Sequence, residues 1–192
     1  MGSVPDFLYT VGMTIALFMI LGGVVWGVYL FNCLVRDRQR VKTAWSDIDV
    51  QLKRRYDLIP KLVAAVKQYA SYERSTLQTL IELRSRTGQV DDVAAKGALE
   101  GQIGSGLRSL MALVEAYPEL KADQSFLQPQ SELTEVENHI QYSRRFYNGS
   151  VRNRNTRIHS FPDSLNARLF AYTPQPFFEL DHAEKEPAEV LS

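Results

Sequence analysis

The residues best suited to metal or acid–base chemistry are three histidines, and their positions favour a structural role. His139, His159 and His182 lack the spacing of zinc ligands, and the last of them lies close to the end of the chain. A di-iron site in a helical bundle needs two Glu-x-x-His pairs that project inward. Glu135 and His139 are four residues apart, and the sequence has no second pair of this kind. We therefore predict no metal site.

The sequence also lacks the surroundings that activate a nucleophile. Cys33 is the single cysteine, which rules out an intramolecular disulfide and a cysteine-based zinc cluster. There is no G-x-S-x-G stretch, and no glycine loop leads into Lys-Ser or Lys-Thr, as phosphate binding requires. We predict neither enzymatic activity nor a bound cofactor.

Length and charge indicate one ordinary domain and give no reason to expect nucleic acid as a partner. The chain has 192 residues, with 22 lysines and arginines against 22 aspartates and glutamates. A neutral chain of this length can bury a core of its own, but it has no bulk positive charge with which to attract phosphates.

The first forty residues predict a membrane-spanning helix. Phe7 to Val35 is a run of 29 residues without one charge. At about 1.5 Å per residue this run exceeds the roughly 30 Å hydrocarbon core of a bilayer. We predict a short extracytoplasmic N-terminus over 1–6 and a transmembrane helix over 7–35. Gly23 and Gly27 form a G-x-x-x-G pair, which favours packing against another membrane helix.

The charges on either side of this run predict its orientation. Only Asp6 precedes it, whereas Arg36, Arg38, Arg40 and Lys42 follow it. Because positive residues collect on the cytoplasmic side, we expect a single-pass protein of the bacterial inner (cell) membrane with its N-terminus outside and its C-terminal domain in the cytoplasm.

Residues 36–172 predict an all-α domain, because apolar residues recur with a helical period and no alternating strand pattern occurs. Four helical segments follow one another, the second over 58–86, the third ending at Pro118 and the fourth over about 129–160, with a short amphipathic piece at 164–171. Comparable lengths favour an antiparallel four-helix bundle. The glycines between 97 and 106 leave two alternatives, a late start of the third helix or close approach by a neighbouring helix.

Pro60 lies in the middle of an apolar stripe, where proline disfavours a helix. A single helix over 36–86 would be about 75 Å long, longer than the segments available to cover it. We favour a turn near residues 55–57, with Asp57 capping a new helix and Pro60 in its first turn. One kinked helix remains the alternative, because the apolar stripe stays nearly in phase across the proline. Beyond the domain, the proline-containing acidic stretch 173–192 predicts a disordered tail.

Three stretches resemble the LemA family of bacterial membrane proteins: "RVKTAWSDIDVQLKRRYDLIPKLVAAVKQYASYER", "LVEAYPELKAD" and "ELTEVENHIQYSRRFYNGSVRNRNTRIHSFP". The similarity runs from about Phe31 to Phe178, with departures at Lys61 and Tyr72, where the family pattern usually has Asn and His. It implies one N-terminal membrane helix, an antiparallel helical bundle and no established biochemical activity. One member is associated with magnetosome membranes, and others are encoded near membrane metalloproteases.

The resemblance implies no catalytic residues but does mark a set of motif positions. We expect structural or interaction roles at Arg54, Arg55, Tyr56, Asp57, Pro60, Glu115, Tyr117, Pro118, Glu137, Asn138, Tyr147, Asn148 and Asn155. The charged members near the proposed turn and on the last helix either form a buried network that fixes helix register or are solvated charges on the bundle surface.

These features favour a membrane-anchored scaffold or adaptor that presents a bundle face to membrane or membrane-proximal partners. The expected partners are the lipid bilayer, a second copy of the chain or other membrane proteins, among them a membrane metalloprotease. The alternative is a membrane-organising or remodelling factor, with a magnetosome-like or envelope-stress accessory role.

Overall fold

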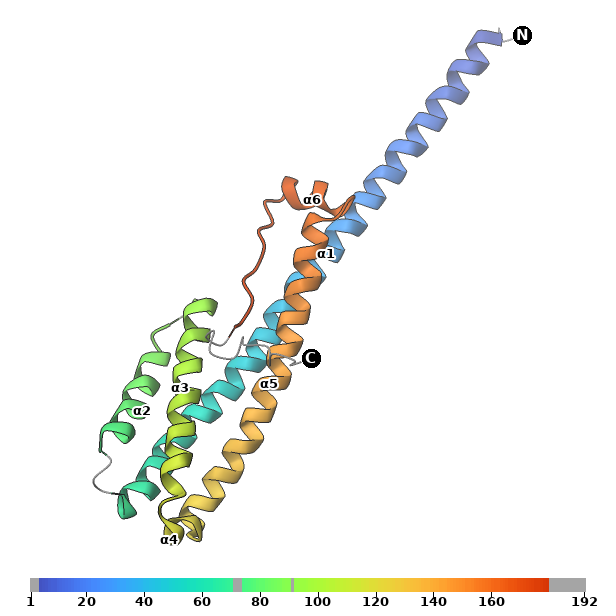
Figure 1. Ribbon diagram of the computed structural model, residues 1–192. Helices are drawn as coiled ribbons and strands as arrows, with labels where there is room; N and C mark the ends of the chain where they lie inside the picture. The colour runs from blue at the N-terminus through green and yellow to red at the C-terminus, as the bar shows by residue number, and fades with distance from the viewer. Residues whose placement is uncertain (1–3, 71–73, 91, 180–192) are drawn as a thin grey trace, which may run out of the picture. The chain divides into compact units, whose positions relative to one another are not determined.

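The computed structural model describes residues 4–70, 74–90 and 92–179, with side chains from residue 9 onward. This part of the chain contains helices, turns and an extended C-terminal segment, so the all-α prediction is confirmed. The helices, labelled in Figure 1, are α1 (Val4–Tyr69), α2 (Arg74–Thr87), α3 (Val93–Val114), α4 (Pro118–Lys121), α5 (Gln124–His159) and α6 (Asp163–Leu169).

The chain divides into two compact units. The first unit comprises Met1–Lys42 and Arg152–Gln175, and the second comprises Thr43–Val151 and Pro176–Ser192. Helices α1 and α5 each contribute to both units, α6 belongs to the first, and α2, α3 and α4 belong to the second.

The core of the second unit is built from apolar stripes that face one another. On α1 the buried positions include Ala44, Ile48, Leu52, Ile59, Leu62 and Val66, and on α3 they include Ile103, Leu107, Leu110 and Val114. In Figure 1 the parts of α1 and α5 that belong to this unit lie beside α2 and α3. The finer arrangement as an antiparallel four-helix bundle stays a prediction.

The turn that we favoured near Asp57 is wrong. Helix α1 continues through Pro60 to Tyr69, and the next helix begins only at Arg74. The amide of Ala70 still donates to the carbonyl of Val66 at 2.9 Å, so helical bonding persists well beyond the proline. The stretch 36–86 is therefore two helices, but they are separated after Tyr69 rather than at the proline.

A side chain from α2 explains how α1 tolerates the proline. In an unbroken helix the N–H of residue 60 would donate to the carbonyl of Tyr56, and proline has no N–H. Arg84 supplies the missing donor, because its Nε lies 2.9 Å from that carbonyl oxygen. The ring of Pro60 is exposed and displaces no packed neighbour. The lost backbone hydrogen bond is thus replaced by a tertiary one.

Two glycines on α3 permit close approach, which decides between the alternatives for the glycine-rich stretch. Helix α3 begins early, at Val93, with the Asp92 side chain accepting from the amide of Ala95 at 2.8 Å. A Cβ at Gly106 would lie 2.7 Å from Cδ2 of Leu80, and one at Gly97 would collide with the carbonyl oxygen of Glu179. A larger residue at either position would displace its neighbour.

Helix α5 starts earlier than the sequence predicts. It begins at Gln124 and contains Pro129, whereas we expected Pro129 to mark its start. The Asp123 carboxylate accepts from the amide of Ser125 at 2.8 Å and so satisfies a donor that the first turn leaves open. This hydrogen bond, together with that from the Tyr69 hydroxyl, lowers the pKa of Asp123.

The first unit packs α6 and the C-terminal end of α5 against α1. Leu34, Ile158 and Ala167 form a buried cluster, with Tyr172 packed against it. The rings of Phe31 and Phe170 lie 4.7 Å apart between centroids. The short amphipathic piece that we predicted at 164–171 therefore corresponds to α6, and its inward side is apolar.

The role assigned to Arg84 is testable with a double-mutant cycle in the full chain. Pro60→Ala should raise the free energy of unfolding by about 1–3 kcal/mol, because alanine restores the N–H. Arg84→Ala should cost about 1 kcal/mol in the natural chain and clearly less in the Pro60→Ala background. Denaturant unfolding measures both values. Arg86→Ala, an exposed arginine on the same helix, is the control, and equal costs of Arg84→Ala in the two backgrounds would refute the assignment.

Candidate functional site

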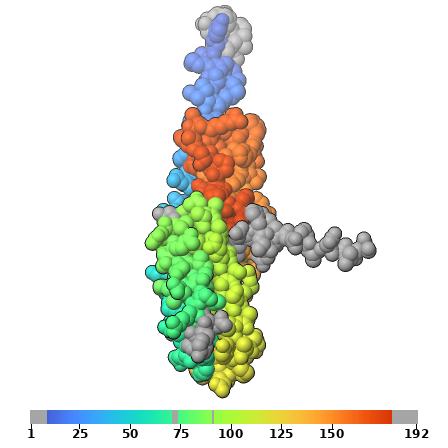
Figure 2. All heavy atoms as spheres, turned by 60° about the vertical axis from the view of Figure 1, so that its left-hand side comes forward, coloured from blue at the N-terminus to red at the C-terminus, as the bar shows by residue number. Residues whose placement is uncertain are grey.

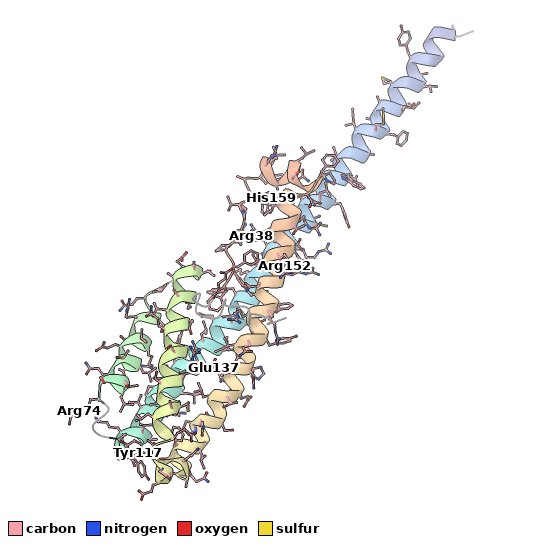
Figure 3. The ribbon with its side chains drawn as sticks, in the orientation of Figure 1. Arg38, Arg74, Tyr117, Glu137, Arg152 and His159 are labelled. Carbon is pink, nitrogen blue, oxygen red and sulfur yellow. The ribbon has the colours of Figure 1, made fainter. Side chains whose placement is uncertain are left out.

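A buried ionic network joins three helices of the second unit. Arg55 on α1 is only 3% exposed and Glu100 on α3 only 1%. Nη2 of Arg55 pairs with the carboxylate of Glu100, and Nη1 lies 2.9 Å from Oε1 of Glu137 on α5, which is labelled in Figure 3. The Tyr56 hydroxyl also donates to Glu100. Of the motif positions, Arg55, Tyr56 and Glu137 therefore lie in one buried network, with Arg55 at its centre.

Burial gives this network a high desolvation cost and makes its stability depend on the geometry of its partners. A guanidinium or carboxylate removed from water is tolerated only when partners satisfy it with good geometry. Burial also raises the pKa of Tyr56, against the opposing positive charge of Arg55 and a hydrogen bond with Thr87. The phenol therefore stays protonated and remains a donor to the Glu100 carboxylate over a wider pH range.

Some of the predicted positions lie outside this network. Arg54 is exposed and has only a long bond, 3.4 Å, to the side chain of Gln51. Asp57 is exposed, 3.9 Å from Arg84, and Asn138 is exposed on α5. For these three the solvated-charge alternative describes the structure better than the buried network does.

Sequence reasoning missed Glu100, although a signal was present. Glu100 stands at helical spacing with the apolar stripe of Ile103, Leu107 and Leu110, so a carboxylate lies where the core is expected. The neighbouring glycines drew the interpretation towards backbone conformation instead. A charged residue in phase with an apolar stripe predicts a buried ion partner elsewhere in the fold.

The cluster Glu115, Tyr117 and Pro118 shapes the connection between α3 and α5. Pro118 occupies the first position of α4, where its missing N–H costs nothing, and Tyr117 precedes it at the N-cap. Glu115 pairs with Lys121 across this short helix. These motif positions are exposed or half-buried, and Figure 3 places Tyr117 at the corner. Their role is to fix a tight connection.

An aromatic cluster in the second unit holds the C-terminal segment. Phe178 is fully buried, and its ring packs edge-on against Trp45 of α1 at 5.4 Å between centroids. The centroid of the Tyr147 ring lies 5.3 Å from that of Trp45, and the Tyr147 hydroxyl donates to the carbonyl of Pro176 at 3.1 Å. Lys96 lies over the Trp45 ring at 5.5 Å.

Asn148 fixes the backbone of the same segment through both ends of its amide. Its Nδ2 donates to the carbonyl of Phe178 at 3.1 Å, and its Oδ1 accepts from the amide of Phe178 at 2.9 Å. These two hydrogen bonds to one residue imitate the pairing of one strand with another. The motif residues Tyr147 and Asn148 therefore bind an extended peptide, which in this structure is the chain itself.

A second clamp of the same kind lies in the first unit. Asn155 donates to the carbonyl of Gln175 and accepts from its amide, each at 2.9 Å. Arg154 donates to the carbonyl of Thr173 at 2.8 Å. Over residues 173–179 the structure thus differs from the predicted disordered tail, because side chains of α5 satisfy the backbone. Residues 180–192 of that prediction, including His182, lie outside the described residues.

The first unit has its own ion cluster on α1, α5 and α6. Arg157 Nε lies 2.7 Å from the buried carboxylate of Asp37, and its Nη1 lies 3.4 Å from Asp163. Burial acts to lower the pKa of Arg157, but the hydrogen bond and charge of Asp37 and the charge of Asp163 raise it overall. Arg157 therefore stays charged and ties the three helices together.

The two glycines proposed for membrane-helix packing lie on an open surface. A Cβ at Gly23 or Gly27 would meet no atom of the described chain within 4 Å. The carbonyl of Gly27 accepts a hydrogen bond from Nδ2 of Asn166 on α6 at 3.0 Å. Gly27 thus has a contact within its own chain, and its packing against another membrane helix stays a prediction.

The described residues contain no group of three or more His, Cys, Asp or Glu side chains arranged to hold a metal ion. His139 and Glu135 form an exposed pair at 3.6 Å on α5. Helix α1 contains a segment that is long and apolar enough to cross a membrane, judged by length and composition. The side chains of α1 from Tyr9 to Trp26 are exposed, and the view in Figure 2 shows no other described element over the blue N-terminal part of this helix.

Fold and site together define a class, an all-helical protein with an apolar N-terminal helix as its candidate membrane anchor. Comparison with known proteins identifies the family. The model of the LemA family matches residues 44–191. Protein LemA of Metamycoplasma hominis is 31% identical over 150 residues, which cover 77% of this chain and 68% of the relative. The chain belongs to the LemA family, as the resemblance in its sequence motifs indicated.

The central position of Glu100 in the network is testable by stability measurements. Glu100→Ala should lower the free energy of unfolding by about 3–5 kcal/mol, because it leaves Arg55 buried with one partner. Glu137→Ala should cost less, about 1–2 kcal/mol, because the Glu137 side chain is 35% exposed. Denaturant unfolding of the full chain measures both. The double variant Arg55→Met with Glu100→Leu should recover most of the loss, and no recovery would argue against an electrostatic origin.

The clamp on Phe178 is testable by hydrogen exchange. Asn148→Ala removes both side-chain bonds to the Phe178 backbone, so exchange of that amide should become about tenfold faster. Mass spectrometry of peptides covering residues 172–179 measures the rate. Asn138→Ala, an exposed asparagine on the same helix, should leave it unchanged. Identical exchange in the Asn148→Ala and natural chains would show that the clamp does not hold the segment.

Proposed function

We propose that this protein is a membrane-anchored scaffold or adaptor of the bacterial inner membrane, without catalytic activity. In this proposal α1 crosses the membrane once, the N-terminus lies outside, and the second unit lies in the cytoplasm. The uncharged run from Phe7 to Val35 supports the anchor. The orientation is supported by Arg36, Arg38, Arg40 and Lys42, which follow the run directly.

The observation that carries the proposal is an exposed aromatic pair on α5. Tyr142, 66% exposed, and Phe146 are one helical turn apart and therefore share a face. Two contacts join α1 to α5: Arg55 pairs with Glu137, and the ring of Trp45 packs against Tyr147. Together they give an antiparallel register in which Val50 stands level with Tyr142.

Val50 on α1 is exposed at that level as well. Aromatic residues are enriched at protein interfaces because they bury much area at little cost in conformational entropy. The surface that we assign to a protein partner is the face of α5 that carries Tyr142 and Phe146, which we call the adaptor face.

The partners that we propose are a second copy of the chain or another membrane protein, with a membrane metalloprotease as one candidate. Gly23 and Gly27 support self-association, since both lie on an open surface where another helix can approach closely. A second candidate function is membrane organisation or remodelling. The exposed arginines Arg38 and Arg40 support it, because such residues attract anionic headgroups.

Site-specific photo-crosslinking in native membranes tests the adaptor face. A benzophenone amino acid in place of Phe146 should give adducts of defined mass, at a yield several-fold above that from the exposed position Arg108 on α3. A product of twice the chain mass identifies self-association, and any other mass identifies a different partner. Equal yields at the two positions would remove the adaptor face from consideration.

A reporter fusion in the same bacterial host tests the orientation. Alkaline phosphatase fused after Ser192 should stay inactive, because that enzyme needs the oxidising environment outside the cytoplasm. An active fusion would contradict the proposed topology.

A further inference from the structure

The level of the membrane boundary along α1 follows from length and polarity. The uncharged run of 29 residues from Phe7 to Val35 is about 43 Å long, roughly 13 Å more than a hydrocarbon core. A tilt of about 20°, the average for membrane helices, shortens the span by only a few ångströms. Part of the run must therefore lie outside the hydrocarbon.

The contacts of α6 show which end of the run lies outside. Asn166 binds the carbonyl of Gly27, and the ring of Phe170 packs on Phe31. Asp163 on the same helix pairs with Arg157. Such polar and charged groups are strongly disfavoured within hydrocarbon. The hydrocarbon therefore ends near residue 27, where the headgroup layer begins, and about 20 residues before it cross the apolar core.

This assignment agrees with the burial of α1 side chains. Trp26 and Tyr29 are exposed and stand where aromatic belts occur, whereas Leu30, Cys33 and Leu34 are buried against the rest of the first unit. Protein contacts thus replace lipid contacts at the level where the hydrocarbon should end.

Helix α6 presents an apolar surface at this level. Leu165 and Leu169 are one helical turn apart, and Leu169 is 75% exposed. Phe161 before the helix and Phe170 after it are exposed as well. We call these four side chains the α6 skirt. Their exposure to water is unfavourable, because apolar surface is more stable in an apolar environment. Figure 2 shows the orange-red surface of this region directly beside the blue segment of α1.

Positive charge accompanies the α6 skirt. Arg36, Arg38 and Arg168 are exposed, and none of them forms an ion pair with another described residue. Arg38, labelled in Figure 3, lines a pocket of about 350 Å³ together with Phe31, Phe170 and Tyr172. A cation beside aromatic rings at the membrane surface suits the phosphate of a lipid headgroup with the start of its chains.

We propose that α6 is an interfacial membrane anchor: the α6 skirt inserts among the headgroups and upper acyl chains of the bilayer, and Arg38 binds the phosphate of an anionic phospholipid. The inference rests on the proposed membrane insertion of α1. It adds a second lipid contact that holds the first unit against the membrane surface. Apolar side chains beside cations are the composition that interfacial helices share.

Fluorescence quenching in lipid nanodiscs tests the α6 skirt in the full chain. Three single variants, Met19→Cys, Leu169→Cys and Tyr142→Cys, are labelled with an environment-sensitive fluorophore, and lipids carrying a spin label quench it. The natural chain, labelled in parallel, measures background from the buried Cys33. Leu165→Cys repeats the measurement if the label at position 169 disturbs folding.

The three positions separate this inference from the proposed anchor. Quenching at positions 19 and 169, at least about twofold above that at 142, is the expected result. Quenching at 19 alone overturns the interfacial role of α6 and leaves the anchor in place. Absence of quenching at 19 overturns the proposed anchor itself, and the inference with it.

Arg38 is tested by the lipid dependence of thermal stability. Phosphatidylglycerol nanodiscs should raise the unfolding midpoint of the natural chain relative to phosphatidylcholine nanodiscs, because a bound lipid stabilises the folded state. Arg38→Gln should remove at least about half of that increase. Arg108→Gln, which removes an exposed charge from the second unit, should preserve it. An equal effect of the two variants would overturn the headgroup assignment.

Discussion

The second unit depends above all on the buried guanidinium of Arg55. It joins three helices, since Arg55 stands on α1 and its partners Glu100 and Glu137 stand on α3 and α5. A shift of any of these helices by one turn would leave a charge in the core without a partner, at a cost of several kcal/mol. The ion network therefore favours this register of the three helices over a shifted one.

Polar side chains also fix the segments that are not helical. The extended C-terminal residues contain Pro174 and Pro176, which lack N–H groups and so exclude the segment from the centre of a sheet. Asn148 and Asn155 bind both backbone groups of one residue each, Phe178 and Gln175. Each clamp satisfies a peptide unit that would otherwise lose its water as it packs against a helix.

The same principle explains the proline in α1 and the position of α6. The carbonyl of Tyr56 lacks its helical donor, and Arg84 of α2 supplies one. Asp37 is buried, and Arg157 joins it to Asp163 at the start of α6. In both units, a polar group that one helix cannot satisfy is satisfied by a neighbouring helix, which makes the local conformation depend on tertiary contacts.

The sequence by itself determined the helical class, the apolar N-terminal segment, the membership of the LemA family and the C-terminal ends of α2 and α5, because these follow from periodicity, charge and local motifs. Only the tertiary structure decided that Pro60 lies inside a helix, that Glu100 completes the network of Arg55, and that residues 173–179 are held in place. Each of these depends on a partner distant in the chain, Arg84, Arg55 or an asparagine of α5. Local propensity carries no information about such partners, since their proximity exists only once the helices have packed.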